Sequence, residues 1–140
     1  DYDMVKLLVD LGADINIKNY DRRTPLHMAV DKKDYDMVKL LVDLGADINI
    51  KDEFENEEIA QMLIEMYGVK DTKGYSPIHT AVDKKDYDMV ELLVKRGANI
   101  NIKDKSGSTP VNNAYYKNDW RMVRLLESLG ASIATIMIKN

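Results

Sequence analysis

Two stretches of this chain are identical over 18 residues. Residues 1–18, DYDMVKLLVDLGADINIK, recur unchanged at residues 34–51, and a near-copy, DYDMVELLVKRGANINIK, occupies residues 86–103. The first two copies begin 33 residues apart, and a fixed period of roughly 20–50 residues is typical of chains built from stacked units. The repetition therefore predicts a solenoid rather than a single globule.

The composition favours a soluble domain and argues against several classes of protein. The chain has 140 residues, 45% of them hydrophobic and 31% charged, which is enough for one domain with a buried core. No apolar run approaches the ~18 residues of a membrane span. The absence of cysteine excludes disulfides and thiolate metal sites, and favours an intracellular, cytoplasmic location. A net charge of −4 and a pI near 5.2 argue against a nucleic-acid partner.

One full unit spans residues 19–51. Thr24 followed by Pro25 is typical of an N-cap and a first helical residue, and predicts a short helix over about 25–32. Asp34 is placed to cap a second, mostly apolar helix. That helix is expected to end before Gly45, because glycine readily adopts the left-handed conformation that closes a helix. The unit is therefore predicted to be a pair of helices joined by a turn.

Two short motifs in these units resemble the ankyrin repeat. The first is Thr-Pro-Leu-His at 24–27, which returns as Ser-Pro-Ile-His at 76–79. The second is Gly-Ala-Asp-Ile-Asn at 12–16 and 45–49, which returns as Gly-Ala-Asn-Ile-Asn at 97–101. The resemblance implies an all-α solenoid of stacked helix-turn-helix units joined by β-hairpin-like loops.

The same register divides the chain, as a single ankyrin-repeat domain, into five units and a tail. These are a partial repeat at 1–18, a full repeat at 19–51, a truncated or degenerate repeat at 52–70, a full repeat at 71–103, a final repeat at 104–136 and a tail at 137–140. The chain begins in mid-repeat and has apolar residues near its end, at Ile136 and Ile138. We therefore expect it to be part of a longer array.

The segment 52–70 departs from the pattern, because it has no Thr-Pro-Leu-His helix. Its apolar residues Ile59, Met62, Leu63 and Met66 keep helical spacing, which predicts a second helix ending near residues 67–68. The residues before it are expected to form an extended acidic segment where a first helix normally lies, with Phe54 filling part of that space. Two explanations remain open: a notch that shapes the binding face, or a decayed repeat.

The sequence offers little catalytic chemistry. His27 and His79 are the only imidazoles, and each lies in the Thr/Ser-Pro-X-His motif, whose resemblance to the family implies a structural role. No nucleophilic set of Ser, His and Asp, no phosphate-binding glycine loop and no metal-binding pattern is present. We expect no enzyme activity, no cofactor, no metal and no small-molecule substrate.

Function is therefore expected to come from the surface. The resemblance implies a protein-protein interaction module that binds a partner protein through its concave face and hairpin loops. Carried over by position, the candidate partner-binding residues are Tyr20, Asp21, Arg23, Lys32, Thr72, Lys73, Tyr75, Lys84, Lys105, Ser108, Tyr116 and Lys117.

Two alternatives to a binding module stay open. One is a structural spacer within a longer ankyrin array, in a host-directed effector or a viral protein, for which the host cytoplasm is the expected location. The other is nucleic-acid binding through the lysine-bearing hairpins, which the acidic balance disfavours. Residues 29–38 and 81–90 are identical, which we attribute to recent duplication. Since a specific partner needs surfaces that differ, the hairpins are the better candidates for specificity.

Overall fold

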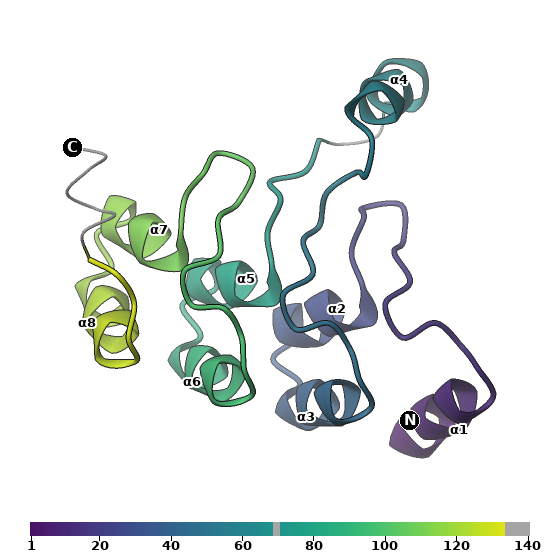
Figure 1. The fold of residues 1–140 in the computed structure, drawn as a ribbon, viewed down its shortest axis with the longest axis horizontal. Helices are drawn as coiled ribbons and strands as arrows, with labels where there is room; N and C mark the ends of the chain where they lie inside the picture. Colours follow the sequence, from purple (N-terminus) through teal and green to yellow (C-terminus); the bar gives the residue numbers. More distant parts are fainter. Residues whose placement is uncertain (69–70, 134–140) are drawn as a thin grey trace.

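The computed structural model describes residues 1–68 and 71–133 and confirms the all-α prediction. In this part of the chain no helix has both the length and the apolar character needed to span a membrane. The described residues form eight helices (Figure 1): α1 (Tyr2–Asp10), α2 (Pro25–Asp31), α3 (Tyr35–Asp43), α4 (Glu57–Tyr67), α5 (Pro77–Asp83), α6 (Tyr87–Lys95), α7 (Pro110–Tyr116) and α8 (Trp120–Ser128). Ile136 and the expected tail at 137–140, which includes Ile138, lie outside the described part.

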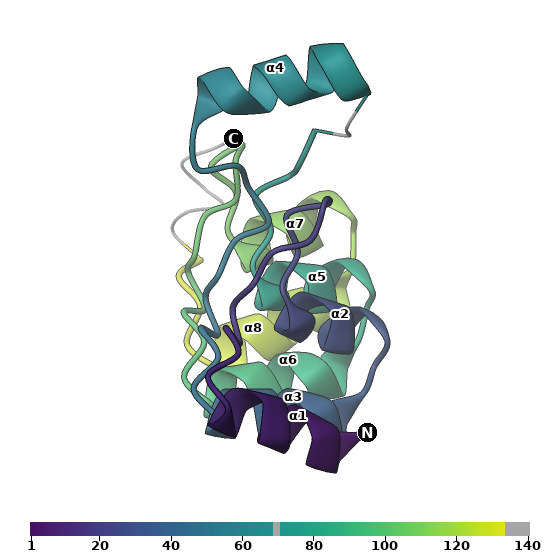
Figure 2. The same ribbon diagram turned by 90° about the vertical axis from the view of Figure 1, so that its right-hand side faces the viewer.

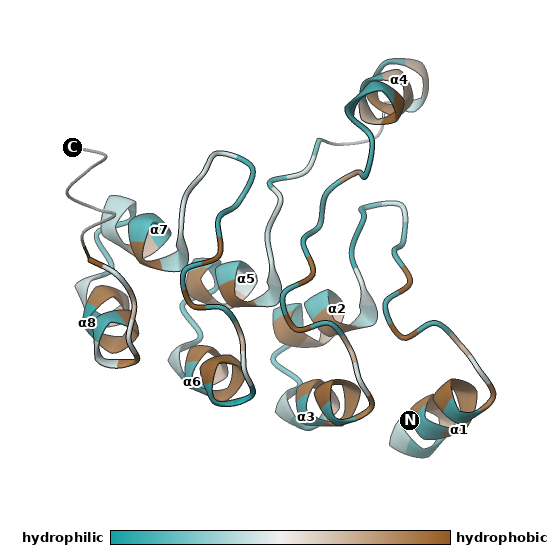
Figure 3. Cartoon of the chain, viewed as in Figure 1, coloured by the Kyte–Doolittle hydropathy of each residue, from teal (hydrophilic) through white to brown (hydrophobic). Residues whose placement is uncertain are grey.

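Seven of the helices form two rows, seen from two sides in Figures 1 and 2. The first helices α2, α5 and α7 form one row, and the second helices α1, α3, α6 and α8 form the other. Each first helix packs on its own second helix and on the next first helix. The apolar faces meet between the rows (Figure 3), and the side chains buried there include Leu26, Val38, Leu41, Ile78, Met89, Leu93, Val111, Met122 and Leu126.

The predicted caps are confirmed and explain where the helices begin. The Thr24 N–H donates to Nδ1 of His27, and the His27 N–H donates to Oγ1 of Thr24, which closes a capping box at the start of α2. Asp34 accepts from the Met37 N–H and caps α3 in the same way. Because these hydrogen bonds satisfy backbone donors that no helical partner reaches, they fix both helix starts locally.

Polar side chains at repeated positions join each unit to the next. One ladder runs from a tyrosine hydroxyl to the aspartate that caps the following second helix: Tyr2 to Asp34 at 2.9 Å, Tyr35 to Asp86 at 2.6 Å, and Tyr87 to Asp119 at 3.0 Å. A second runs from a backbone N–H to an asparagine side chain of the preceding unit: Asp47 to Asn16, Asn99 to Asn49 and Ser132 to Asn101. Several residues of the identical segments 29–38 and 81–90 therefore make equivalent contacts between units.

Helix α4 does not take the place expected for it. The helix itself is confirmed and ends at Gly68. However, it lies beyond the tips of the hairpins, away from both helix rows (Figures 1 and 2), and α2 packs directly on α5. The expectation that 52–70 fills the place of a repeat, with an extended segment where a first helix normally lies and Phe54 in its space, is wrong. No space is vacated, because the two neighbouring first helices close on each other.

The segment is instead an insertion in a hairpin that keeps its closing hydrogen bonds. In the last hairpin the Asp104 N–H donates to the Ser108 carbonyl, and the Ser108 N–H donates to the Asp104 carboxylate. The Asp52 N–H donates to the Tyr75 carbonyl at 2.8 Å, and the Tyr75 N–H donates to the Asp52 carboxylate at 2.5 Å. Asp52 and Tyr75 thus occupy the equivalent positions, and the 19 residues 53–71 are additional.

Deletion of residues 53–71 is expected to leave the helix rows intact. The shortened hairpin, Asp52-Thr72-Lys73-Gly74-Tyr75, would have the length and the glycine position of the hairpin at 104–108. The free energy of unfolding should stay constant or rise by up to about 2 kcal/mol, since closing a shorter loop costs less entropy. Urea denaturation followed by circular dichroism measures this. Loss of the cooperative transition would show that the stack needs the segment.

Gly74 is expected to be the least replaceable glycine of the hairpins. Its φ is +68°, and a Cβ added there would lie 2.8 Å from the Lys105 backbone nitrogen, whereas a Cβ on Gly107 would have open space. Gly74→Ala should therefore lower the free energy of unfolding by roughly 2 kcal/mol, and Gly107→Ala by about 1 kcal/mol, the cost of left-handed backbone alone. Equal losses in urea denaturation would contradict the close packing of the two hairpins.

Candidate functional site

The candidate residues spread over one surface, which we call the inner face. It is formed by α2, α5 and α7 together with the hairpins at 19–23, 72–75 and 104–108. The structure places the twelve candidates in three classes of exposure: Tyr20, Asp21, Lys32, Lys73, Lys84, Lys105, Tyr116 and Lys117 are exposed, Arg23, Thr72 and Tyr75 are half-buried, and Ser108 is buried.

Ser108 is a correction to the predicted site. The sequence predicts an exposed hairpin residue, but only 9% of the surface of Ser108 is exposed. Its N–H donates to the Asp104 carboxylate, and its carbonyl oxygen lies 3.1 Å from Nε2 of His79 in the preceding unit. The residue is therefore enclosed by the contact between two units.

Arg23 and Tyr75 also contribute to the stack. The Arg23 guanidinium donates to the carbonyl of His27 at 3.2 Å and lies 4.0 Å from the Asp31 carboxylate. The ring of Tyr75 stacks on His79 with the centroids 5.2 Å apart, and burial raises the pKa of its phenol. Replacing either residue would disturb the packing of units as well as any bound partner.

The two histidines connect the units, in line with their expected structural role. Because the backbone N–H of Thr24 donates to Nδ1 of His27, the proton of the neutral ring lies on Nε2, which donates to the Tyr75 carbonyl at 2.9 Å. His79 forms the equivalent bond to Ser108. Burial lowers the pKa of His27 to about 4 and also lowers that of His79. Both rings are therefore neutral near pH 7.

Two of the charged candidates on the first helices form an ion pair with the preceding unit. Lys84 lies 3.2 Å from Asp31, and Lys117 pairs with Asp83 one unit further along. Such exposed pairs contribute about 0–1 kcal/mol each, so a partner could replace them at little cost. Within the described residues Lys32, the equivalent lysine of the first full unit, has no ion pair closer than 4 Å.

The hairpin at 104–108 is held against its neighbour and against the insertion. The Lys105 N–H donates to the Lys73 carbonyl, and the Lys105 ammonium lies 2.9 Å from Asp71 and 3.9 Å from Glu57. The Asp71 pair lowers the pKa of that carboxyl and raises the pKa of Lys105. Lys105 is therefore exposed but already paired.

A small polar depression of about 240 Å³ lies on the inner face between the units of α2 and α5. It is lined by charges of both signs and by two hydroxyl groups: Arg23, Asp31, Asp52, Lys73, Tyr75, Thr80, Asp83 and Lys84. Burial raises the pKa of Asp52, and the hydrogen bond from the Tyr75 N–H offsets part of this rise. The depression offers donors and acceptors for polar side chains of a partner. Among the described residues no group of three or more His, Asp or Glu side chains could hold a metal ion.

Sequence reasoning missed a cleft beside the first hairpin, of whose lining residues only Tyr20 is among the twelve candidates. Lys18, Asn19, Tyr20, Arg22, Phe54, Leu63 and Tyr67 line a cleft between this hairpin and α4. The signal for it was available: the second and third copies of the repeated segment start 52 residues apart instead of 33, which shows that 19 residues are added between them.

Two family models match the chain. One, described as ankyrin repeats (3 copies), matches residues 1–52, and another, described as ankyrin repeats (many copies), matches residues 63–114. Together they span the chain from α1 into α7, apart from residues 53–62. No curated protein sequence matches the chain significantly.

Proposed function

Because the chain belongs to the ankyrin-repeat family, whose members are generally protein–protein interaction modules, we propose that it binds a partner protein through its inner face. In this proposal the protein catalyses no reaction and acts inside a cell. Binding would use the rigidity of the stacked units, because a surface that is already ordered loses little entropy on association.

The observation that carries this proposal is that the polar residues fall into two groups: repeated residues join the units, and residues that differ between hairpins project from the surface. The tyrosine–aspartate and asparagine ladders use repeated residues to join the units. The side chains that differ between hairpins, such as Tyr20 and Lys73, project from the surface instead, and 92% of Tyr20 is exposed. Aromatic and cationic residues of this kind commonly supply binding energy at protein interfaces.

The test compares two variants that each lose four exposed side chains. The inner-face variant carries Lys32→Ala, Lys73→Ala, Lys84→Ala and Tyr116→Ala, and leaves Arg23 and Tyr75 in place because these two support the stack. The control variant carries Asp36→Ala, Lys39→Ala, Asp88→Ala and Lys95→Ala, all exposed positions on the second helices α3 and α6. Circular dichroism checks that both remain folded.

Affinity capture from a native lysate, read by mass spectrometry, then decides between the proposals. A partner captured by the intact chain and the control variant, but lost by the inner-face variant, is the expected result. Capture of the same partner by all three would place the contact elsewhere. No specific capture by the intact chain would contradict the binding module and favour a structural spacer.

A further inference from the structure

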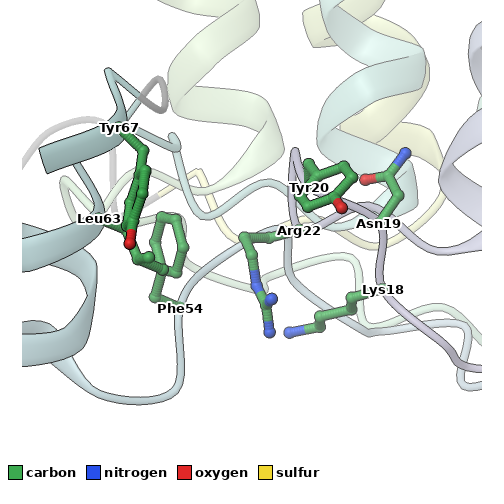
Figure 4. A pocket seen from close by; sticks show the side chains of 7 residues that line it. All are labelled: Lys18, Asn19, Tyr20, Arg22, Phe54, Leu63 and Tyr67. Atoms are coloured by element: carbon green, nitrogen blue, oxygen red, sulfur yellow. The ribbon is translucent and has the colours of Figure 1, made fainter.

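The 19-residue insertion forms one wall of a cleft beside the first hairpin. The cleft has a volume of about 630 Å³ and lies between the hairpin at 19–23 and α4 (Figure 4). Lys18, Tyr20 and Arg22 come from the hairpin side, and Phe54, Leu63 and Tyr67 face them from the insertion. One wall is therefore cationic and the other apolar.

The two cations of the cleft have no carboxylate partner among the described residues. The Lys18 ammonium donates to the backbone carbonyl of Glu53 at 3.1 Å. The Arg22 guanidinium lies over the Phe54 ring, 5.3 Å from its centroid, and its Nε atom is buried without an acceptor. In Figure 4 the Lys18 side chain points toward the guanidinium end of Arg22. An anionic group beside these two ends would accept hydrogen bonds from the Lys18 ammonium and from the terminal nitrogens of Arg22.

Three acidic side chains of the insertion do not fill this place. The Glu53 carboxylate is directed toward the next hairpin, where its Oε2 lies 3.3 Å from the Cβ position of Gly74. Glu57 and Asp71 face Lys105. The cleft is thus a local surplus of positive charge in a chain whose net charge is −4, and electrostatic complementarity favours an acidic ligand there.

The apolar wall favours a ligand whose acidic group lies close to an apolar group. Tyr67 is 70% exposed, and Leu63 and Phe54 are half-buried beside it. Contact with an apolar side chain would remove their apolar surface from water, which is favourable. A nucleic-acid strand fits less well, because Glu55, Glu57, Glu58 and Glu65 are exposed along the insertion and would repel successive phosphates.

We propose that this cleft docks a short peptide segment of a partner protein in which an aspartate or glutamate lies close to a large apolar side chain. The carboxylate accepts from Lys18 and Arg22, and the apolar side chain packs on Phe54, Leu63 and Tyr67. This inference rests on the proposed protein-binding function and adds a second contact, on the side of the first hairpin that faces α4, with a defined chemistry.

The test begins with a library of random dodecamer peptides displayed on phage and selected against the immobilised chain. Recovered peptides are synthesised with a fluorescein label and titrated by fluorescence anisotropy. We expect an aspartate or glutamate beside Phe, Leu, Trp or Met. Changing that acidic residue to its amide should weaken binding at least about tenfold, as should raising the salt concentration.

The chain offers a matched variant for the cationic wall. Arg22 has φ +60°, and glycine occupies the equivalent positions 74 and 107, so Arg22→Gly removes the guanidinium without backbone strain. Arg22→Gly should lower the affinity for the selected peptides at least about tenfold, and Lys18→Met should do the same. Lys39→Met on α3 should leave the affinity unchanged. Deletion of residues 53–71 should abolish binding, and the inner-face variant, which retains Tyr20, should bind normally.

Several results would overturn the proposal: no selected peptides, peptides without an acidic residue, full affinity for Arg22→Gly, or binding retained after the deletion. Displacement of the peptide by an equimolar single-stranded oligonucleotide would assign the cleft to nucleic acid instead. The inner face is tested separately by lysate capture. If the inner-face variant still captured the partner while the peptide results were as expected, the cleft would remain as the binding site.

Discussion

Replacing Leu41 by alanine is expected to lower the free energy of unfolding by about 3 kcal/mol, while the same change at Leu8 should cost about 1 kcal/mol or less. The two leucines occupy the same position in an identical sequence of 18 residues. Leu41 is 2% exposed between the helix rows, whereas Leu8 on α1 is 49% exposed. Helix propensity and the neighbouring residues of the sequence cancel in this comparison, so the difference isolates burial between units.

Urea denaturation of the two variants and the unchanged chain provides the measurement. Amide hydrogen exchange adds a local control in the unchanged chain. No residue of α1 is buried, whereas α3 buries Val38 and Leu41, so the amides of α1 should exchange faster than those of α3 despite their identical sequences. Equal losses for Leu8→Ala and Leu41→Ala would show that position in the stack does not determine stability.

The regular part of the fold could be predicted because its signals are local. Thr24, Pro25 and His27 lie within four residues of one another and fix the start of α2 by themselves. Asp34 does the same for α3. The repetition of such signals at a constant spacing then indicates stacking, since each helix pair has an apolar face that only a neighbouring pair can cover.

The place of α4 could not be predicted from the same kind of signal. The spacing of Ile59, Met62 and Leu63 indicates a helix with an apolar side, but it does not indicate what that side packs against. The place depends on a pairing between Asp52 and Tyr75, which are 23 residues apart in the chain. The contact of α2 with α5, which leaves no room for another unit, is visible only in three dimensions.

The candidate site was predicted less well than the fold for a related reason. The register assigns positions to the hairpins, but the exposure of each side chain depends on the following unit. Ser108 is buried because His79 reaches its carbonyl, and Tyr75 is half-buried because its ring stacks on His79. Tyr20 lies in the first hairpin, which no histidine of a preceding unit contacts, and its predicted exposure is confirmed.

Acidification from pH 6.5 to pH 4 is expected to destabilise the unchanged chain more than a His27→Asn/His79→Asn variant. Burial of His27, together with the nearby cations Arg23 and Lys18, lowers its pKa from 6.5 to about 4, although the bond to Tyr75 acts in the opposite direction. Between these values the unfolded chain binds more protons than the folded chain, so stability falls as the pH falls. The His27 contribution to this loss is about 3 kcal/mol, and His79 adds a loss of the same sign.

Asparagine is the appropriate replacement because the chain already uses it at the equivalent place in the last unit. The Thr109 N–H donates to Oδ1 of Asn112 at 3.1 Å, and the Asn112 N–H donates back to the Thr109 hydroxyl. The capping box therefore persists without an ionisable group. The variant should be less stable than the unchanged chain at pH 7, because each lost hydrogen bond to the next unit contributes about 1 kcal/mol.

The decisive measurement is the free energy of unfolding from urea denaturation at several pH values between 4 and 7. Carboxyl groups titrate in both proteins, so the difference between their curves isolates the histidines. Since the unchanged chain begins more stable and loses more, the curves should converge and then cross as the pH falls. Parallel curves would contradict the lowered pKa of the two rings. A crossing would show that the hydrogen bonds of His27 and His79 to the next unit stabilise the stack at neutral pH, and that burial of the same two rings makes the stack sensitive to acid.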